Sequence, residues 1–94
     1  MSTPKLFTPA KVGDITTEHR VVLAPLTRFR ADAQHVPTDL VVEHYAERAA
    51  VRGTILITEA TFIAPQAGGY AFVPGISSPE QIAGWKKVSV SLRE

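Results

Sequence analysis

The sequence has 94 residues, enough for one domain at most and for a core of modest size. Its 45% hydrophobic content excludes a disordered chain, and its net charge of +1 gives no reason to expect a nucleic acid or a membrane surface as partner. Cysteine is absent, which excludes disulfides and thiolate metal sites, and the sequence shows neither a secretory signal nor a membrane span, so we expect a cytoplasmic protein.

A hairpin and a buried strand are the first predicted elements. Residues 11–17 favour a short hairpin that turns at Gly13 and Asp14. The β-branched run 20–24 then predicts a strand covered on both faces, which Pro25 ends because proline donates no ladder hydrogen bond.

A helix over residues 39–50 follows, with apolar side chains recurring every four residues from Val41. Thr38 or Asp39 can cap its start, and Gly53 is typical of a helix stop. The pattern predicts a helix that covers a strand with one apolar face.

The clearest strand spans 54–60, and its continuous apolar centre again predicts burial on both faces. A long loop over 61–76 follows, rich in glycine and proline, and long loops in compact folds are often functional. Ser78 and Gln81 predict a capping box at the start of a last helix, which runs through Val88.

Two buried strands joined by a helix indicate a right-handed β-α-β unit with parallel strands. Such a unit leaves its outer edges open, so it is expected to be part of a larger α/β fold, either a doubly wound sheet or a closed barrel. The sequence holds about two β/α units.

Few residues carry an obvious chemistry. We assign ordinary structural or surface roles to His19, His35 and His44, because none has partners at metal-ligand spacing. We find no phosphate-binding glycine loop after either strand, so a Rossmann site is not indicated.

Ligands of parallel α/β folds bind beyond the carboxyl ends of the strands, where two short segments lie. Residues 25–28 follow the first strand and 59–62 the second. Thr27 offers a hydroxyl donor, and Ala60 is small enough for a flat ligand to approach the backbone. By position alone, two packed loops are an equally good interpretation.

Several ordered segments resemble the N-terminal part of one family. They are Leu6-Phe7-Thr8-Pro9, Lys11-Val12-Gly13, Ala24-Pro25-Leu26-Thr27-Arg28-Phe29-Arg30-Ala31, Tyr45-Ala46-Glu47-Arg48-Ala49, Gly53-Thr54-Ile55-Leu56-Ile57-Thr58-Glu59-Ala60 and Pro65-Gln66-Ala67-Gly68-Gly69-Tyr70. From about Leu6 to Val88, the chain resembles old yellow enzymes, especially fungal members and the branch that serves ergot-alkaloid pathways.

The resemblance implies a TIM (β/α)8 barrel that binds FMN noncovalently at its C-terminal face, with the hairpin closing the opposite end. NADPH or NADH reduces the flavin, and its hydride then passes to an alkene activated by a carbonyl or nitro group. The family is thus expected to act as ene-reductases on small α,β-unsaturated substrates. The cofactor supplies the chemistry, while the protein positions and tunes it.

The resemblance also assigns residues. Those that match flavin-contacting positions are Pro25, Leu26, Thr27 and Ala60. Thr27 matches a threonine that bonds the flavin ring near its C4 carbonyl. Phe62 and Tyr70 match aromatic positions at the mouth of the substrate pocket, although packing of the loop explains Tyr70 equally well. Arg28 and Arg30 are expected to tie down their loop.

Other parts of the family site are expected on later strands, outside this chain. They include the glutamine under the flavin, the residues that bind the substrate carbonyl, the proton-donating tyrosine and the phosphate-binding arginine. The tail 89–94 fits the family pattern poorly. We therefore expect residues 1–94 to form a single partial domain without catalytic residues of its own, inactive alone.

Two other interpretations compete with the fragment of an oxidoreductase. One is a non-enzymatic interaction module, and the exposed strand edges would also permit self-association. The other is a flavodoxin-like domain, which the Pro-Leu-Thr-Arg sequence at 25–28 argues against, because a phosphate loop belongs at that position.

Overall fold

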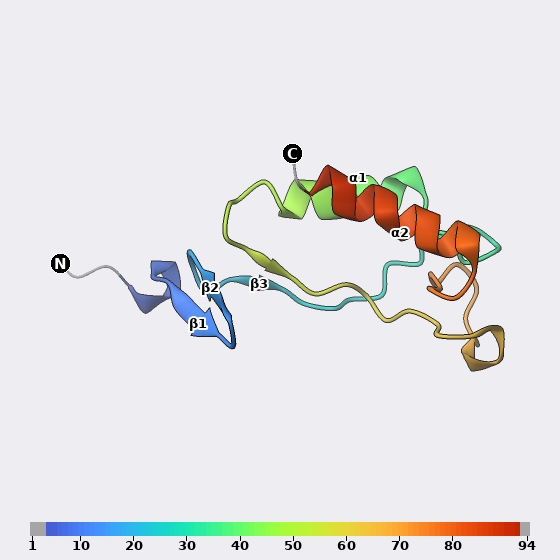
Figure 1. The fold of residues 1–94 in the computed structure, drawn as a ribbon, viewed down its shortest axis with the longest axis horizontal. Coiled ribbons are helices and arrows are strands. Elements are labelled where there is room, and N and C mark those ends of the chain that lie inside the picture. The colour runs from blue at the N-terminus through green and yellow to red at the C-terminus, as the bar shows by residue number, and fades with distance from the viewer. Residues whose placement is uncertain (1–3, 93–94) are drawn as a thin grey trace.

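The computed structural model describes residues 4–92, so the end of the predicted tail, 93–94, lies outside it. In chain order, the elements are a 3-10 turn (Lys5–Phe7), β1 (Ala10–Val12), β2 (Ile15–Thr17), β3 (Val22–Leu23), α1 (Asp39–Arg48), β4 (Ile55–Leu56), a second 3-10 turn (Pro65–Ala67) and α2 (Pro79–Ser91). Helices α1 and α2 lie side by side, while β1 and β2 lie at the end of the molecule nearer the N-terminus (Figure 1).

The predicted hairpin is confirmed by the antiparallel pair β1 and β2, in which Val12 lies opposite Ile15. Gly13 begins the turn with φ of +60°, a left-handed conformation that glycine adopts without a steric cost. At the other end, the buried Thr17 hydroxyl accepts a hydrogen bond from the Ala10 N–H at 3.2 Å. A turn and a side chain therefore fix the hairpin at its two ends.

Strand β3 pairs with β4 in parallel, with Val22 opposite Ile55, which confirms the β-α-β unit. Both strands are shorter than the predicted 20–24 and 54–60, because each has a single partner. The prediction that both faces would be covered is wrong: 42% of Val22 and 46% of Ile57 are exposed. Helices from residues 4–92 cover one face of the pair and leave the other open.

The core lies between the β3–β4 pair and the two helices. Val41 and Tyr45 of α1 are each 2% exposed and pack with Val88 of α2, which is 3% exposed. Leu23 and Trp85 are among the partly buried side chains around them. The apolar spacing of the α1 sequence therefore identified the correct buried face.

Helix α1 begins at Asp39 as predicted, but its end and its N-terminal cap differ from the prediction. The helix stops at Arg48, two residues before the predicted end, and Gly53 instead adopts φ of +77° in the turn that leads into β4. Thr38 is the N-cap residue, but its hydroxyl donates to the Arg30 carbonyl at 2.6 Å and caps no helix N–H. Thr38 therefore fastens the preceding loop to the start of α1.

The start of α2 is the capping box that the sequence predicts. The Ser78 hydroxyl accepts from the Gln81 N–H at 3.1 Å, and the Gln81 side chain accepts from the Ser78 N–H at 3.1 Å. Gln81 Nε2 also donates to the Gln34 carbonyl at 3.1 Å. A Cβ on Gly84 would lie 2.8 Å from Pro37 Cδ, so glycine permits this close approach of α2.

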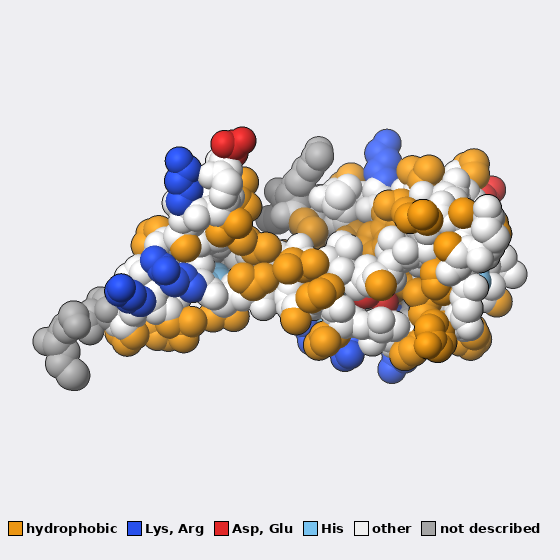
Figure 2. All heavy atoms as spheres, turned by 90° about the horizontal axis from the view of Figure 1, so that it is seen from below, with side chains coloured by type: hydrophobic (Ala, Val, Ile, Leu, Met, Phe, Trp, Pro, Cys, Tyr) orange, Lys and Arg blue, Asp and Glu red, His pale blue; other side chains and the backbone are white. Residues whose placement is uncertain are grey.

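The molecule exposes more surface than a compact domain of its size. Its accessible area is 6788 Å², against about 5300 Å² expected for a folded monomer of this mass. Its radius of gyration is 15.3 Å, against about 12 Å for a compact domain of this length. Apolar side chains are spread along a long face of the molecule (Figure 2). The chain thus presents the surface of an incomplete domain.

Candidate functional site

The candidate site lies where the chain leaves β3 and β4 at their carboxyl ends. The Ile57 N–H donates to the Leu23 carbonyl at 3.1 Å, which continues the pairing of the two chains one residue beyond the end of β4. Because the strands are parallel, residues 24–27 and 57–60 leave the sheet at the same end (Figure 1). The topology therefore places both predicted segments at the carboxyl ends of the two strands, as predicted.

A hydrogen-bonded junction joins these segments to each other and to α1. The Arg28 N–H donates to Glu59 Oε2 at 3.2 Å, and the Tyr45 hydroxyl donates to Glu59 Oε1 at 3.2 Å. The Glu59 N–H donates in turn to the Tyr45 hydroxyl at 2.9 Å. Glu59 and Tyr45 are each 2% exposed. We call Arg28, Tyr45 and Glu59 the three-way junction.

The residues predicted to face a cofactor lie on the open surface beside the junction. Pro25, Leu26 and Ala60 are exposed, and Thr27 is half-buried. The Thr27 hydroxyl forms no hydrogen bond with another of the residues 4–92, so it is free to donate to a ligand. Thr27 precedes Arg28 and Ala60 follows Glu59, so each is one residue away from a residue of the junction.

The two arginines of the first segment fasten the loop, as expected. Arg28 Nε donates to the Thr27 carbonyl at 3.0 Å. Arg30 Nη1 donates to the Arg28 carbonyl at 3.2 Å and to the Phe29 carbonyl at 3.3 Å. Phe29 itself has φ of +56°, which is uncommon for a residue with a Cβ. Both guanidinium groups therefore support a tightly turned backbone.

The two aromatic residues predicted for a substrate pocket have different surroundings. Phe62 is half-buried, and its ring meets the His35 ring edge to face at 5.2 Å. Its N–H donates to the Pro74 carbonyl at 3.1 Å. Tyr70 is 69% exposed and contacts the Phe29 ring at 6.5 Å. The structure thus brings Tyr70 to the loop after β3, while Phe62 holds the long loop closed.

A shallow cavity of about 420 Å³ adjoins Tyr70 and is also lined by His35 and Phe72. Neither Thr27 nor Ala60 lines it. Within residues 4–92, the predicted flavin-facing residues and the predicted pocket residues therefore do not form one enclosed cavity.

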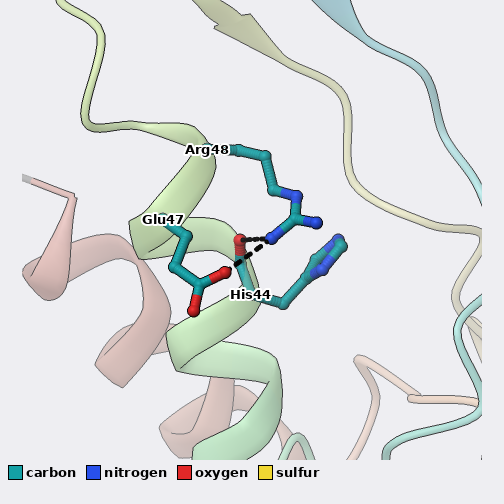
Figure 3. A network of polar contacts seen from close by, with 3 residues as sticks. All are labelled: His44, Glu47 and Arg48. Carbon is teal, nitrogen blue, oxygen red and sulfur yellow. Dashed lines mark hydrogen bonds and ion pairs between the residues drawn. The ribbon is translucent and has the colours of Figure 1, made fainter.

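A second polar network lies on α1 (Figure 3). Arg48 Nη1 donates to Glu47 Oε2 at 2.9 Å and to the His44 carbonyl at 3.3 Å. Burial lowers the pKa of His44 below its usual value, and the Arg48 cation adds to this effect. Burial likewise raises the pKa of the Tyr45 phenol. At neutral pH both groups are therefore held in their uncharged forms.

The residues that the structure describes, 4–92, contain neither a metal-binding cluster nor a membrane-spanning helix. No group of three or more histidine, cysteine, aspartate or glutamate side chains could hold a metal ion there. Over the same residues, no helix is both long and apolar enough to cross a membrane.

The arrangement suits one edge of a flat, planar ligand. Thr27 supplies a hydroxyl, and the exposed Ala60 leaves its backbone accessible. Arg28 Nε and Arg30 Nη1 donate to carbonyls of their own loop, and both arginines are otherwise exposed.

Sequence reasoning missed the part that Glu59 plays. The sequence contained a signal for it, because a carboxylate two residues after the apolar run 55–57 must find buried donors if the strand end is covered. Tyr45, on the predicted apolar face of α1, was the hydroxyl available at that depth.

Comparisons with known proteins agree on the family. The profile of the NADH:flavin oxidoreductase / NADH oxidase family matches residues 5–94. The chain is 58% identical over 85 residues to the NADP-dependent oxidoreductase lnbE of Aspergillus flavus. It is 53% identical over 85 residues to the chanoclavine-I aldehyde reductase fgaOx3 of Penicillium roqueforti. Each match covers 90% of this chain but only 22% and 23% of the relatives.

A solved structure extends this agreement to the fold. The Old Yellow Enzyme of a Pichia species superposes with a TM-score of 0.89 at 44% identity, covering 95% of this chain and 23% of that enzyme. The predicted β/α-barrel portion is thereby confirmed, including the hairpin that precedes it. The chain therefore belongs to the NADH:flavin oxidoreductase / NADH oxidase family, and its fold is the N-terminal portion of an old yellow enzyme barrel.

Proposed function

We propose that this chain contributes one edge of the FMN site in an NAD(P)H-dependent oxidoreductase that reduces the C=C bond of α,β-unsaturated carbonyl compounds. The observation that carries the proposal is the Arg28–Glu59 hydrogen bond, which fastens the two strand-end segments together beside Thr27 and Ala60. Membership of the family supports flavin chemistry. The name of the Aspergillus relative specifies NADP, which favours NADPH as the reductant.

Bound FMN supplies the hydride chemistry, while these residues bind and orient its ring. The Thr27 hydroxyl donates a hydrogen bond to a ring carbonyl, which stabilises electron density on the reduced ring. Pro25 and Leu26 form an apolar wall, and the small Ala60 lets the ring approach the backbone. Phe62 and the exposed Tyr70 belong to the side where the alkene enters.

We also propose that the 94-residue chain alone is inactive. The chain spans 22–23% of the length of the curated relatives it matches, and within residues 4–92 neither Thr27 nor Ala60 lines the cavity beside Tyr70. We expect the purified chain to lose FMN on dialysis and to show no cyclohexenone-dependent oxidation of NADPH. Visible absorbance of bound flavin and loss of NADPH absorbance measure the two properties. A yellow protein with enone-dependent turnover would contradict this proposal.

A chimera tests the contribution to the FMN site. The Aspergillus relative would carry this chain in place of its own matching segment, and FMN content and cyclohexenone reduction would be measured. Thr27→Val keeps the side-chain shape and removes the donor, so we expect flavin affinity to fall about tenfold. Thr16→Val, on the exposed hairpin, is the matched control. Equal flavin affinity for both variants would remove Thr27 from the site.

A bulky side chain at Ala60 tests the other side of the same edge. Ala60→Leu should block the approach of the flavin ring and leave the chimera largely free of FMN. Ala83→Leu makes the same change on the exposed face of α2 and should retain the flavin. Full FMN content in the Ala60→Leu chimera would contradict the assignment.

The large exposed surface favours a second candidate function, a non-enzymatic interaction module. The accessible area exceeds that of a compact monomer by about 1500 Å², more than one partner contributes to a standard interface. In residues 4–92, the outer edges of β3 and β4 pair with no further strand. We expect concentration-dependent self-association of the isolated chain by sedimentation velocity. A monomer at all concentrations that also fails to bind the barrel relative would exclude this function.

A further inference from the structure

Glu59 stands out because a carboxylate is buried beside a surface that is otherwise open. It is 2% exposed, whereas its chain neighbours Thr58 and Ala60 are both exposed. Burying a carboxylate is costly unless donors replace its lost hydration. The side chain therefore points inward, against the helix layer, for a structural reason that its hydrogen bonds must provide.

Those bonds come from two separate elements. Oε1 accepts from the Tyr45 hydroxyl of α1, and Oε2 accepts from the Arg28 N–H of the segment after β3. The Tyr45 hydroxyl accepts in turn from the Glu59 N–H, so backbone and side chain of Glu59 are both fixed to α1. One residue thus holds the segment after β3, the segment after β4 and the helix.

The position of this junction decides what it controls. Thr27 and Ala60 are each one residue away from a hydrogen-bonded backbone group of the junction. The next backbone hydrogen bond that joins the two segments is from Ile57 to Leu23, farther back at the strand ends. Without the Glu59 carboxylate, the segment that contains Thr27 would lose its nearest hydrogen bond to the segment that contains Ala60.

We propose that Glu59, with Tyr45, is a positioning residue that sets the Thr27 hydroxyl and the Ala60 backbone relative to one another. That these two groups contact a flavin rests on the function proposed above, whereas the positioning itself does not. Nothing in the junction requires Glu59 to touch a ligand, because its carboxylate faces the core.

Two conservative variants of the 94-residue chain test the positioning. In Glu59→Gln, an NH2 group that can only donate replaces one carboxylate oxygen, so the two oxygens that accept from the Arg28 N–H and the Tyr45 hydroxyl are no longer both present. Tyr45→Phe removes the hydroxyl and leaves the Glu59 N–H without its partner. Val88→Ala is the control, because it weakens the same apolar cluster but touches no polar group of the junction.

The readout is residue-specific hydrogen exchange and amide chemical shift by NMR. We expect Glu59→Gln to raise the exchange rate of the Arg28 amide about tenfold relative to core amides, and to shift the Thr27 and Ala60 signals. We expect Val88→Ala to raise exchange throughout the core without singling out Arg28. If both junction variants leave the Arg28, Thr27 and Ala60 amides as in the unmodified chain, the positioning proposal is wrong.

An FMN titration of the unmodified chain separates this proposal from the proposed function. Millimolar FMN should shift the Thr27 and Ala60 amides if these residues face the flavin. If FMN shifts neither signal while Glu59→Gln still releases the Arg28 amide, the positioning stands and the proposed flavin edge fails. If FMN produces the same shifts in Glu59→Gln as in the unmodified chain, Glu59 does not position these groups.

Discussion

Apolar side chains of the helical side and of the sheet side of the molecule are buried to different extents. On the helical side, Tyr45 and Val88 are 2% and 3% exposed. On the sheet side, Val22 and Ile57 remain 42% and 46% exposed, although they belong to apolar runs typical of buried strands. Apolar side chains are therefore buried only where a second layer of the molecule is available to cover them.

The hairpin extends this contrast. Val12 and Ile15 are 51% and 55% exposed, yet the turn and register of β1 and β2 are well defined. Turn chemistry at Gly13 acts locally and needs no tertiary partner, whereas burial of a strand face does. The local hairpin is therefore fully formed in this chain, whereas the strand pair β3–β4, which needs a covering layer on each face, is covered on one face only.

Two tyrosines give the largest expected contrast between the regions. Tyr45→Ala should cost about 4 kcal/mol, because it leaves a cavity in the core and removes a partner of the buried Glu59 carboxylate. This loss should abolish cooperative unfolding as followed by circular dichroism. Tyr70→Ala changes a residue that is 69% exposed and should stay within about 0.5 kcal/mol. Similar losses for both variants would remove the distinction between core and open surface.

A pair of valines on α2 compares the two faces of a single helix. Val88→Ala should destabilise the chain by about 2 kcal/mol, because it removes two buried methylene equivalents. Val90→Ala, at a position 45% exposed, should have an effect below about 0.5 kcal/mol. Urea titration measures both. A larger effect at Val90 would mean that the exposed face of α2 is covered in solution.

The capping box at the start of α2 should contribute less to the free energy of unfolding than the core residues do. Ser78→Ala removes the acceptor for the Gln81 N–H and should cost about 1 kcal/mol. Ser89→Ala removes only an exposed hydroxyl that donates within the same helix, and should change stability by less than about 0.5 kcal/mol. Equal effects would show that the start of α2 frays in solution.

The smallest expected effect on stability comes from protonation of His44 as the pH falls. Because the pKa of His44 is lowered in the folded chain, its contribution is present above the unfolded value of 6.5 and is lost as pH falls through the folded pKa. The melting temperature should therefore fall slightly between pH 7.5 and 5.5, and His44→Gln should flatten that dependence. A melting temperature that rises over the same interval would contradict the sign.

Much of the fold could be predicted from the sequence, because its signals are local. The hairpin turn, the capping box at Ser78 and the buried face of α1 all follow from residues a few positions apart. The parallel pairing of β3 and β4 followed from their apolar runs and the intervening helix. The end of α1 was misjudged, because Gly53 serves a later turn.

The candidate site was less accessible to prediction. The strand ends identified the segments that carry Thr27 and Ala60, but the bond between the Arg28 N–H and the Glu59 carboxylate joins residues 31 positions apart. No pattern in the sequence specifies which backbone group a carboxylate will accept from. The left-handed backbone of Phe29 was equally hidden, because phenylalanine carries no preference for it.

The extended surface of the chain has a consequence for how its unfolding will look in a denaturant titration. Sensitivity to urea and the heat-capacity change both scale with the area that unfolding newly exposes. A chain of this mass has about 14800 Å² when unfolded, so the present fold hides about 8000 Å² where a compact domain would hide about 9500 Å². Its urea slope should therefore be about 15% shallower than that of a compact protein of equal length, and its melting transition correspondingly broad.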